Sequence, residues 1–222
     1  MKKHILCFGD SNTHGYCAET FDCIDGGERF NEDERWTCLL GKHLGNDYLV
    51  LEEGLGGRTT VFQDPLTEGL CGLDVIFPIM MSHEPIDLLV IMLGTNDTKE
   101  RFGVTAECIS VGMERLINKA KSTAAWKNNQ PNILLIAPPH ILDKMYSGPF
   151  SGVMGSGCAE KSRQLAFFYK EVAKRTGCHF LDIEGIAEFN PTDGMHLTKK
   201  GHSALAAYLT NIIPEMVNRY EK

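Results

Sequence analysis

Ile5-Leu6-Cys7-Phe8-Gly9-Asp10-Ser11-Asn12 is the stretch of sequence that decides the fold. Its first four residues form a continuous apolar run, which is typical of a strand buried in a parallel sheet. The next four are turn formers, so the strand is expected to end in a sharp exit that carries a serine. An α/β enzyme exposes its nucleophile at such an exit. The stretch therefore predicts a buried first strand and a candidate nucleophile, Ser11.

Similar apolar runs, bounded by Gly, Pro or Asp, recur along the chain. They predict further strands, and apolar residues at helical spacing predict helices between them. The expected strands lie at 5–8, 48–51, 88–93, 133–137 and 179–183; the expected helices lie around 36–44, 111–117, 165–172 and 197–220, with an interruption at Pro214 in the last one. This alternation favours right-handed crossovers and a doubly wound parallel sheet.

The fold class that follows is α/β, as a three-layer α/β/α fold with a five-stranded, flavodoxin-like parallel sheet. The length of 222 residues fits a single domain over residues 1–222, and no composition shift marks a boundary. Ligands of such sheets bind outside the carboxyl ends of the strands. We therefore expect the functional residues in the segments that follow the strands.

Three turn segments other than the one at Ser11 stand out. Gly56-Gly57-Arg58-Thr59 follows the second expected strand, Gly94-Thr95-Asn96-Asp97 follows the third, and Asp193-Gly194-Met195-His196 precedes the last helix. Each segment alone could be an ordinary turn or helix cap. Together with the Ser11 segment, they place a nucleophile, an amide donor and an Asp-His pair at one rim of the sheet. Turns that serve folding alone would have no reason to combine these groups.

A serine hydroxyl needs an adjacent base, and His196 has the best credentials among the eight histidines. Asp193, three residues earlier, is expected to hold its Nδ1–H and leave Nε2 facing Ser11. His14 is a rival base, but a side chain so close to Ser11 in sequence is hard to aim at its Oγ. His83, His140 and His202 are interpreted as surface or helix-packing residues.

An acyl-transfer site also needs donors for the oxyanion. We expect the Asn96 side-chain amide, the Gly57 backbone N–H and the Ser11 backbone N–H to supply them. Asp10 and Asp97 are expected to fix loop hydrogen bonds. Arg58 is expected to pair with one of these carboxylates or to help shape the pocket.

The composition limits the partners. A formal net charge of -7 and the lack of a Lys/Arg cluster argue against nucleic acid and anionic membranes, and favour neutral or cationic small molecules. The eight cysteines are scattered without a Cys-x-x-Cys pair, so buried free thiols are expected. No ligand cluster has metal spacing, so we expect neither a metal nor an organic cofactor. The short apolar run near Met1 does not fit a signal peptide, and a cytoplasmic protein is expected.

Three connections, at 16–34, 63–84 and 140–156, are too long for simple turns. They are candidate walls of a binding pocket or contacts between subunits. Tyr16, Phe30 and Trp36 are expected to wall a small pocket near Ser11.

The four turn segments resemble the conserved blocks of the SGNH or GDSL hydrolases, in order and over essentially the whole chain. Within that family, Ile91-Met92-Leu93-Gly94-Thr95-Asn96-Asp97-Thr98-Lys99 is similar to the bacterial arylesterase and acyltransferase branch. The resemblance implies hydrolysis of short-chain esters, acyl transfer to alcohols and a homo-oligomer. Asn12 replaces the leucine of the family motif and is expected to alter the pocket wall rather than the chemistry.

The function favoured by the sequence is that of a serine esterase that cleaves acetyl-type esters through an acyl-enzyme. A carbohydrate O-deacetylase with the same residues is a second hypothesis, and sequence does not separate the two. A third is a non-catalytic domain whose Gly-rich rim binds a small anion at a helix N-terminus. The presence of Ser11, Asn96, Asp193 and His196 together argues against this third hypothesis.

Overall fold

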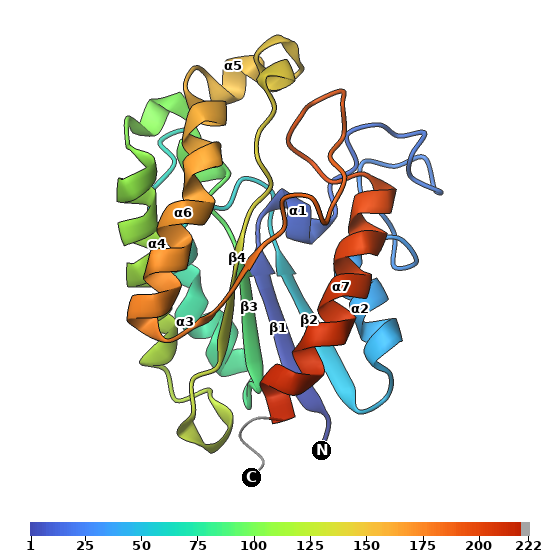
Figure 1. Cartoon of the computed structure of the whole chain (residues 1–222), viewed down its shortest axis with the longest axis vertical. Coiled ribbons are helices and arrows are strands. Elements are labelled where there is room, and N and C mark those ends of the chain that lie inside the picture. Colours follow the sequence, from blue (N-terminus) through green and yellow to red (C-terminus); the bar gives the residue numbers. More distant parts are fainter. Residues whose placement is uncertain (219–222) are drawn as a thin grey trace.

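A parallel sheet forms the centre of the molecule in a computed structural model that describes residues 1–218 (Figure 1). Its strands are β1 (Lys3–Gly9), β2 (Tyr48–Gly54), β3 (Leu88–Met92), β4 (Ile133–Ala137) and β5 (His179–Asp182). The strand order is β2-β1-β3-β4-β5, and every neighbouring pair is parallel. The predicted five-stranded, flavodoxin-like sheet is confirmed.

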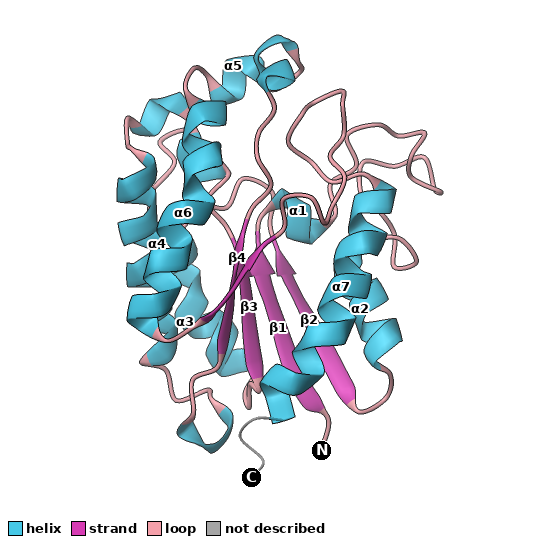
Figure 2. Cartoon of the chain, in the orientation of Figure 1, coloured by secondary structure: helices cyan, strands magenta, loops and turns pink. Residues whose placement is uncertain are grey.

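Helices cover both faces of this sheet, which gives the predicted three layers (Figure 2). Helices α3 (Gly72–Ser82), α4 (Ala106–Lys121) and α6 (Cys158–Thr176) lie on one face, and α2 (Trp36–Leu44) and α7 (Lys199–Asn218) lie on the other. Each helix that packs on the sheet needs an apolar stripe facing it. On α4 this stripe is formed by Met113, Leu116 and Ile117, which recur at helical spacing.

The strands are continuous apolar runs because both of their faces are buried. Side chains alternate between the two faces of a strand. Leu6 and Phe8 of β1 accordingly pack with α3, α4 and α6, whereas Ile5 and Cys7 pack with α2 and α7. All four side chains are fully buried. The two cores thus have β1 in common, and they fix the strand that leads to Ser11.

The carboxyl ends of β1, β2 and β3 meet at one edge of the sheet. Gly9 is aligned with Gly54 of β2 and Met92 of β3. The chain then turns into the short helix α1 (Ser11–His14), and a Cβ on Gly9 would lie 2.0 Å from the Thr13 Oγ1 of that helix. Gly9 is therefore needed for this close approach, which brings Ser11 over the sheet edge.

Two expectations about the helices were wrong. The connection 63–84 was expected to be a long loop, but it contains α3, whose interior includes Pro78. The last helix was expected to be interrupted at Pro214, but α7 continues through it to Asn218. Part of the expected helix 197–220, its end at Tyr220, lies outside the described residues. The connection 140–156 also has local structure, a 3₁₀ turn (Asp143–Ser147) and the one-turn helix α5 (Ser151–Met154).

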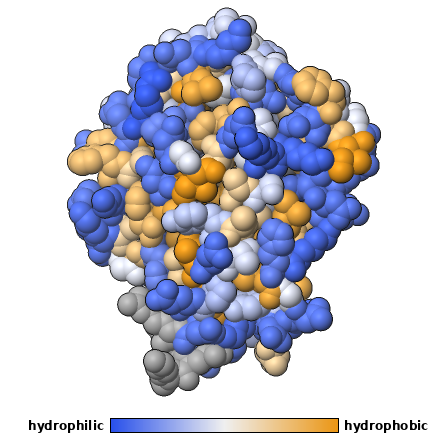
Figure 3. All heavy atoms as spheres, turned by 45° about the vertical axis from the view of Figure 1, so that its right-hand side comes forward, coloured by the Kyte–Doolittle hydropathy of each residue, from blue (hydrophilic) through white to orange (hydrophobic). Residues whose placement is uncertain are grey.

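The surface mixes many hydrophilic residues with separate hydrophobic ones on the face seen in Figure 3. Within residues 1–218, no helix combines the length and the apolar character that crossing a membrane requires. The cysteines are free thiols, and five of them are buried, but Cys108 is exposed. The prediction of buried thiols is therefore correct for most of them and wrong for Cys108.

Candidate active site

Ser11, His196 and Asp193 form a hydrogen-bonded chain at the carboxyl edge of the sheet. The distance between His196 Nε2 and Ser11 Oγ is 2.8 Å, and that between His196 Nδ1 and Asp193 Oδ2 is 2.6 Å. Ser11 is 8% exposed, and His196 and Asp193 are almost fully buried. A base that contacts the hydroxyl and is oriented by a carboxylate is the arrangement that activates a serine.

The Asp193 turn explains why a spacing of three residues suffices. The second carboxylate oxygen, Oδ1, accepts hydrogen bonds from the backbone N–H groups of Met195 and His196, at 3.0 and 3.1 Å. Burial raises the pKa of Asp193, but the hydrogen bond from His196 and these backbone donors outweigh it, and the net pKa lies below the usual value. Asp193 is therefore held as a carboxylate facing His196.

Asn12 has a role that the sequence analysis missed. Its side chain donates to the Met195 carbonyl at 3.1 Å and accepts from the Leu197 N–H at 2.9 Å, so it holds the chain on both sides of His196. Asn12 is buried and does not line the cavity at Ser11. The expectation that it alters the pocket wall was wrong, because the tight α1 turn directs its side chain at the histidine loop instead.

The expected oxyanion donors lie around Ser11. Gly57 and Asn96 line the same cavity as Ser11. Gly57 has φ of +85°, which favours glycine, and the Asn96 amide donates one hydrogen bond to the Arg58 carbonyl at 3.2 Å. Residues 1–218 form many backbone–backbone hydrogen bonds in turns, loops and helix caps. Neither the Ser11 N–H nor the Gly57 N–H is a donor in any of these bonds.

Asp10 and Asp97 fix loops, as expected. Asp10 Oδ1 accepts from the Asn12 N–H at 3.0 Å and so begins α1, and Asp97 Oδ1 accepts from the Thr60 N–H at 2.9 Å. Burial raises the pKa of each carboxyl to about 6. Arg58 neither lines the cavity nor hydrogen-bonds to these carboxylates; it donates to the Gly9 carbonyl at 3.0 Å and lies over the Phe8 ring.

A cavity of about 250 Å³ opens beside Ser11. Two of the three long connections wall it: Tyr16 comes from 16–34, and Phe150, Val153 and Met154 come from 140–156. The rings of Tyr16 and Phe150 lie 4.6 and 5.5 Å from the His196 ring, centroid to centroid. The candidate base thus packs against two aromatic side chains, which also contact each other.

Phe30 and Trp36 do not wall the cavity, contrary to expectation. Both are fully buried, Phe30 in a small cluster with Cys17 and Cys23 and Trp36 in the core under α7. Trp36 acts indirectly, because its Nε1–H donates to the Asn12 carbonyl at 3.1 Å.

The three histidines interpreted as surface or helix-packing residues make contacts away from Ser11. His202 is fully buried rather than on the surface: its Nδ1 accepts from the Trp36 N–H at 3.2 Å, and burial lowers its pKa to about 3. It is therefore a neutral packing residue. His83 and His140 contact the carboxylates of Glu53 and Glu184, at 2.9 and 3.2 Å.

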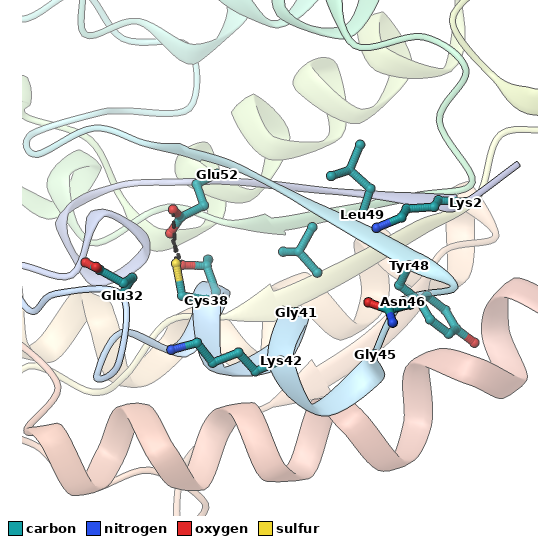
Figure 4. Close-up of a pocket in the computed structure, with 12 residues that line it drawn as sticks. Lys2, Glu32, Cys38, Gly41, Lys42, Gly45, Asn46, Tyr48, Leu49 and Glu52 are labelled. Atoms are coloured by element: carbon teal, nitrogen blue, oxygen red, sulfur yellow. Dashed lines mark hydrogen bonds between the residues drawn. The ribbon is translucent and has the colours of Figure 1, made fainter.

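A second hollow, of about 370 Å³, lies between α2 and the edge strand β2 (Figure 4). Glu32 and Glu52 are the carboxylates at this hollow, and Glu52 is engaged by Arg35 at 2.7 Å and by the Cys38 thiol at 3.3 Å. The residues that line it include no serine or histidine, so it offers no Ser-His pair. Within residues 1–218, no group of three His, Cys, Asp or Glu side chains is placed to hold a metal ion.

A parallel α/β/α sheet that brings a Ser-His-Asp chain to its carboxyl edge is typical of the class of serine hydrolases. Comparison with known proteins narrows this class. Residues 7–204 match the model of the GDSL-like Lipase/Acylhydrolase family. The chain belongs to this family, and it is a carboxylic ester hydrolase.

Solved structures and a curated relative agree with this assignment. The chain is 34% identical to the M. smegmatis aryl esterase, with 96% of this chain and 99% of that one covered and a TM-score of 0.87. It is 31% identical to Est24, a carbohydrate acetylesterase from Sinorhizobium meliloti, with 97% and 100% covered and a TM-score of 0.87. It is 26% identical to the probable rhamnogalacturonan acetylesterase YesY of Bacillus subtilis, with 97% of this chain and 94% of YesY covered.

Proposed function

We propose that the protein is a serine esterase that cleaves short-chain, acetyl-type esters through an acyl-enzyme on Ser11. The single observation that carries this proposal is the hydrogen-bonded chain from Ser11 Oγ through His196 to Asp193. In this proposal Ser11 attacks the ester carbonyl while His196 Nε2 accepts the hydroxyl proton. Asp193 holds the imidazole by Nδ1–H and stabilises its charged form.

The tetrahedral intermediate places a negative charge on the former carbonyl oxygen. The Ser11 and Gly57 backbone N–H groups and the Asn96 amide are the donors in this proposal, because they lie at the same cavity and are preorganised by the strand ends. His196 then gives its proton to the leaving alcohol. Water, activated by His196 in turn, releases the carboxylic acid by the reverse path.

Transfer of the acyl group to an alcohol is the second activity that we propose for this site. The aromatic and aliphatic walls of the cavity, among them Tyr16, Phe150 and Met154, disfavour bulk water and favour an organic acceptor over it. An alcohol in place of water would attack the acyl-enzyme with the same help from His196. The measurement is product analysis with ethyl acetate and a second alcohol, with transesterification expected beside hydrolysis.

Removal of acetyl groups from carbohydrates is an alternative function of the same residues. It is supported by the names of two relatives, the carbohydrate acetylesterase Est24 and the probable rhamnogalacturonan acetylesterase YesY. Comparing kcat/KM for acetylated xylo-oligosaccharides with that for aryl acetates distinguishes the two. A higher value for the sugar esters would favour the deacetylase.

The test of the proposed chemistry is Ser11→Ala. This substitution removes the attacking oxygen and should leave the fold intact. Hydrolysis of p-nitrophenyl acetate should therefore fall to the background rate. The matched control is Ser151→Ala, which removes a hydroxyl from α5 outside the hydrogen-bonded chain. Hydrolysis by Ser11→Ala at the wild-type rate would remove Ser11 from the mechanism.

A further inference from the structure

Lys99 contributes a cationic side chain to the cavity beside Ser11. It lines this cavity together with Ser11, His196 and the apolar walls. Among the lining residues it is the only one with a permanently charged type of side chain, and it is 5% exposed. A buried ammonium is costly unless something compensates its charge.

The compensation inside the protein is shared. Lys99 Nζ lies 3.4 Å from Asp64 Oδ2, and Arg101 lies 3.4 Å from the other oxygen of the same carboxylate. One carboxylate thus serves two cations, and both contacts are long for charge-assisted hydrogen bonds. Burial lowers the pKa of Lys99, although Asp64 opposes this effect. An ammonium has three N–H donors, and Asp64 takes one of them.

A further charge nearby does not reach the cavity. The carboxylate of Asp97 influences Lys99, but Asp97 is fully buried, is directed at Thr60 and does not line the cavity. Asp64 and Arg101 do not line it either. Of this group of charged residues, Lys99 is therefore the one that lines the cavity, and its counter-charges lie outside the lining.

We propose that Lys99 forms an anion subsite in the cavity at Ser11 and that the preferred esters of this enzyme carry a carboxylate. This inference rests on the proposed function of Ser11. It also departs from the expectation of neutral or cationic ligands drawn from the overall charge of -7, because a direct contact acts at short range whereas the net charge acts through screening solvent. A carboxylate fits better than a neutral hydroxyl, since it supplies the missing charge as well as a hydrogen-bond acceptor.

The carboxylate could belong to the alcohol or to the acyl part of the ester, and two matched pairs of substrates separate these cases. The first pair is 4-acetoxybenzoate and its neutral isostere 4-acetoxybenzamide. The second pair is monoethyl succinate and ethyl succinamate. In at least one pair, the wild type should prefer the carboxylate by about tenfold or more in kcat/KM, mainly through a lower KM.

Lys99→Met removes the ammonium and keeps the length of the side chain. The preference should then fall to about one, and it should persist in the control Lys174→Met, which changes an exposed lysine on α6. Equal kcat/KM values within both pairs in the wild type, or a preference that persists in Lys99→Met, would overturn the inference. A purely structural Lys99 would lower stability without changing the preference.

Inhibition of the wild type provides a measurement that does not depend on the folding of a variant. Benzoate should compete with p-nitrophenyl acetate, with an inhibition constant at least about tenfold below that of benzamide. Equal constants would overturn the anion subsite alone. Failure of the wild type to hydrolyse p-nitrophenyl acetate and both substrate pairs would instead overturn the proposed function, and the subsite with it.

Discussion

At the scale of single residues, Asn12 shows how a site can depend on a side chain that takes no part in the chemistry. Its side-chain amide donates to the carbonyl of the residue before His196 and accepts from the N–H of the residue after it. The backbone carbonyl of Asn12 in turn accepts a hydrogen bond from the Trp36 Nε1–H. The distance of 2.8 Å between His196 and Ser11 therefore depends on a contact between residues 183 positions apart in the chain. Asn12 is a positioning residue.

We expect Asn12→Leu to lower kcat by about ten- to a hundredfold with little change in KM. Leucine leaves the Leu197 N–H and the Met195 carbonyl unpaired and lets His196 shift, and small misplacements of catalytic groups carry costs of this size. Rates should be normalised by titration with a fluorophosphonate, so that loss of folded protein is not mistaken for loss of kcat. An unchanged normalised kcat would contradict the positioning role.

Asn96→Ala should lower kcat by about a hundred- to a thousandfold, because its amide is proposed to bind the oxyanion more tightly than the ground-state carbonyl. KM should change little. Steady-state kinetics with p-nitrophenyl acetate checks this. A rise in KM at constant kcat would make Asn96 a substrate-binding residue instead.

The placement of Ser11, Asn96, Gly57 and His196 at one cavity, with Asp193 buried against His196, could be predicted from sequence, since each belongs to a local turn motif next to a predicted element. The contacts of Asn12 and Lys99 could not. Both depend on which way a side chain leaves a tight turn, and that direction is set by packing against segments far away in the chain. The same reason explains why Phe30 and Trp36 were wrongly placed at the pocket.

At the scale of elements, the ends of the strands are joined by buried polar groups. Asp10 follows β1, and Asp97, which follows β3, holds Thr60 in the segment after β2. Each of the two carboxyls has one oxygen, Oδ2, without a hydrogen-bond partner in the described structure. Buried polar groups make the strand ends rigid when they are hydrogen-bonded. A buried carboxylate that is charged and lacks a partner lowers the stability of the fold.

This cost predicts a pH dependence of stability. The pKa of Asp97 rises from 3.8 to about 6 on folding, so the folded state binds the proton more tightly. Its contribution to stability is therefore full below pH 4 and is lost as the pH rises to about 6. Asp97→Asn should thus gain stability relative to the wild type between pH 4 and 7.

Denaturant unfolding of both proteins over this range is the measurement. The difference between them is needed because His202, whose pKa is lowered to about 3, acts with the opposite sign in the same window. That contribution is common to both proteins and cancels. A difference that stays constant with pH would contradict the raised pKa of Asp97.

The strands were predictable because burial on both faces leaves continuous apolar runs. Helix α3 was missed because Gly72 at its start and Pro78 inside it are read as loop signals, although Leu73, Ile76 and Met80 have helical spacing. Pro214 was likewise taken as a break. A proline removes one backbone hydrogen bond, and apolar contacts of α7 on both sides of it, at Ile213 and Val217, keep the helix intact.

At the scale of the whole molecule, the cavity is assembled from distant parts of the chain. The strand ends supply the polar groups, and the connections 16–34 and 140–156 supply the aromatic walls. Its volume of about 250 Å³ is small, and the rings of Tyr16 and Phe150 lie within 5.8 Å of each other. We therefore expect this cavity to accept compact acyl groups.

We expect acetate and propionate esters to be preferred over octanoate esters by about tenfold or more in kcat/KM. In an open apolar groove each added methylene would instead contribute roughly 0.8 kcal/mol and the values would climb. A series of p-nitrophenyl esters measures this, and Phe150→Ala should move the optimum to longer chains. A wild-type optimum at eight or more carbons would contradict a small pocket.

The central claim is that Ser11 is the nucleophile, and mapping of a covalent adduct tests it most directly. Wild-type protein is treated with a fluorophosphonate, digested, and analysed by mass spectrometry to locate the modified residue. The adduct should lie on Ser11 at a stoichiometry near one, and Ser11→Ala should remain unmodified. An adduct on any other residue, or wild-type labelling of Ser11→Ala, would contradict the account.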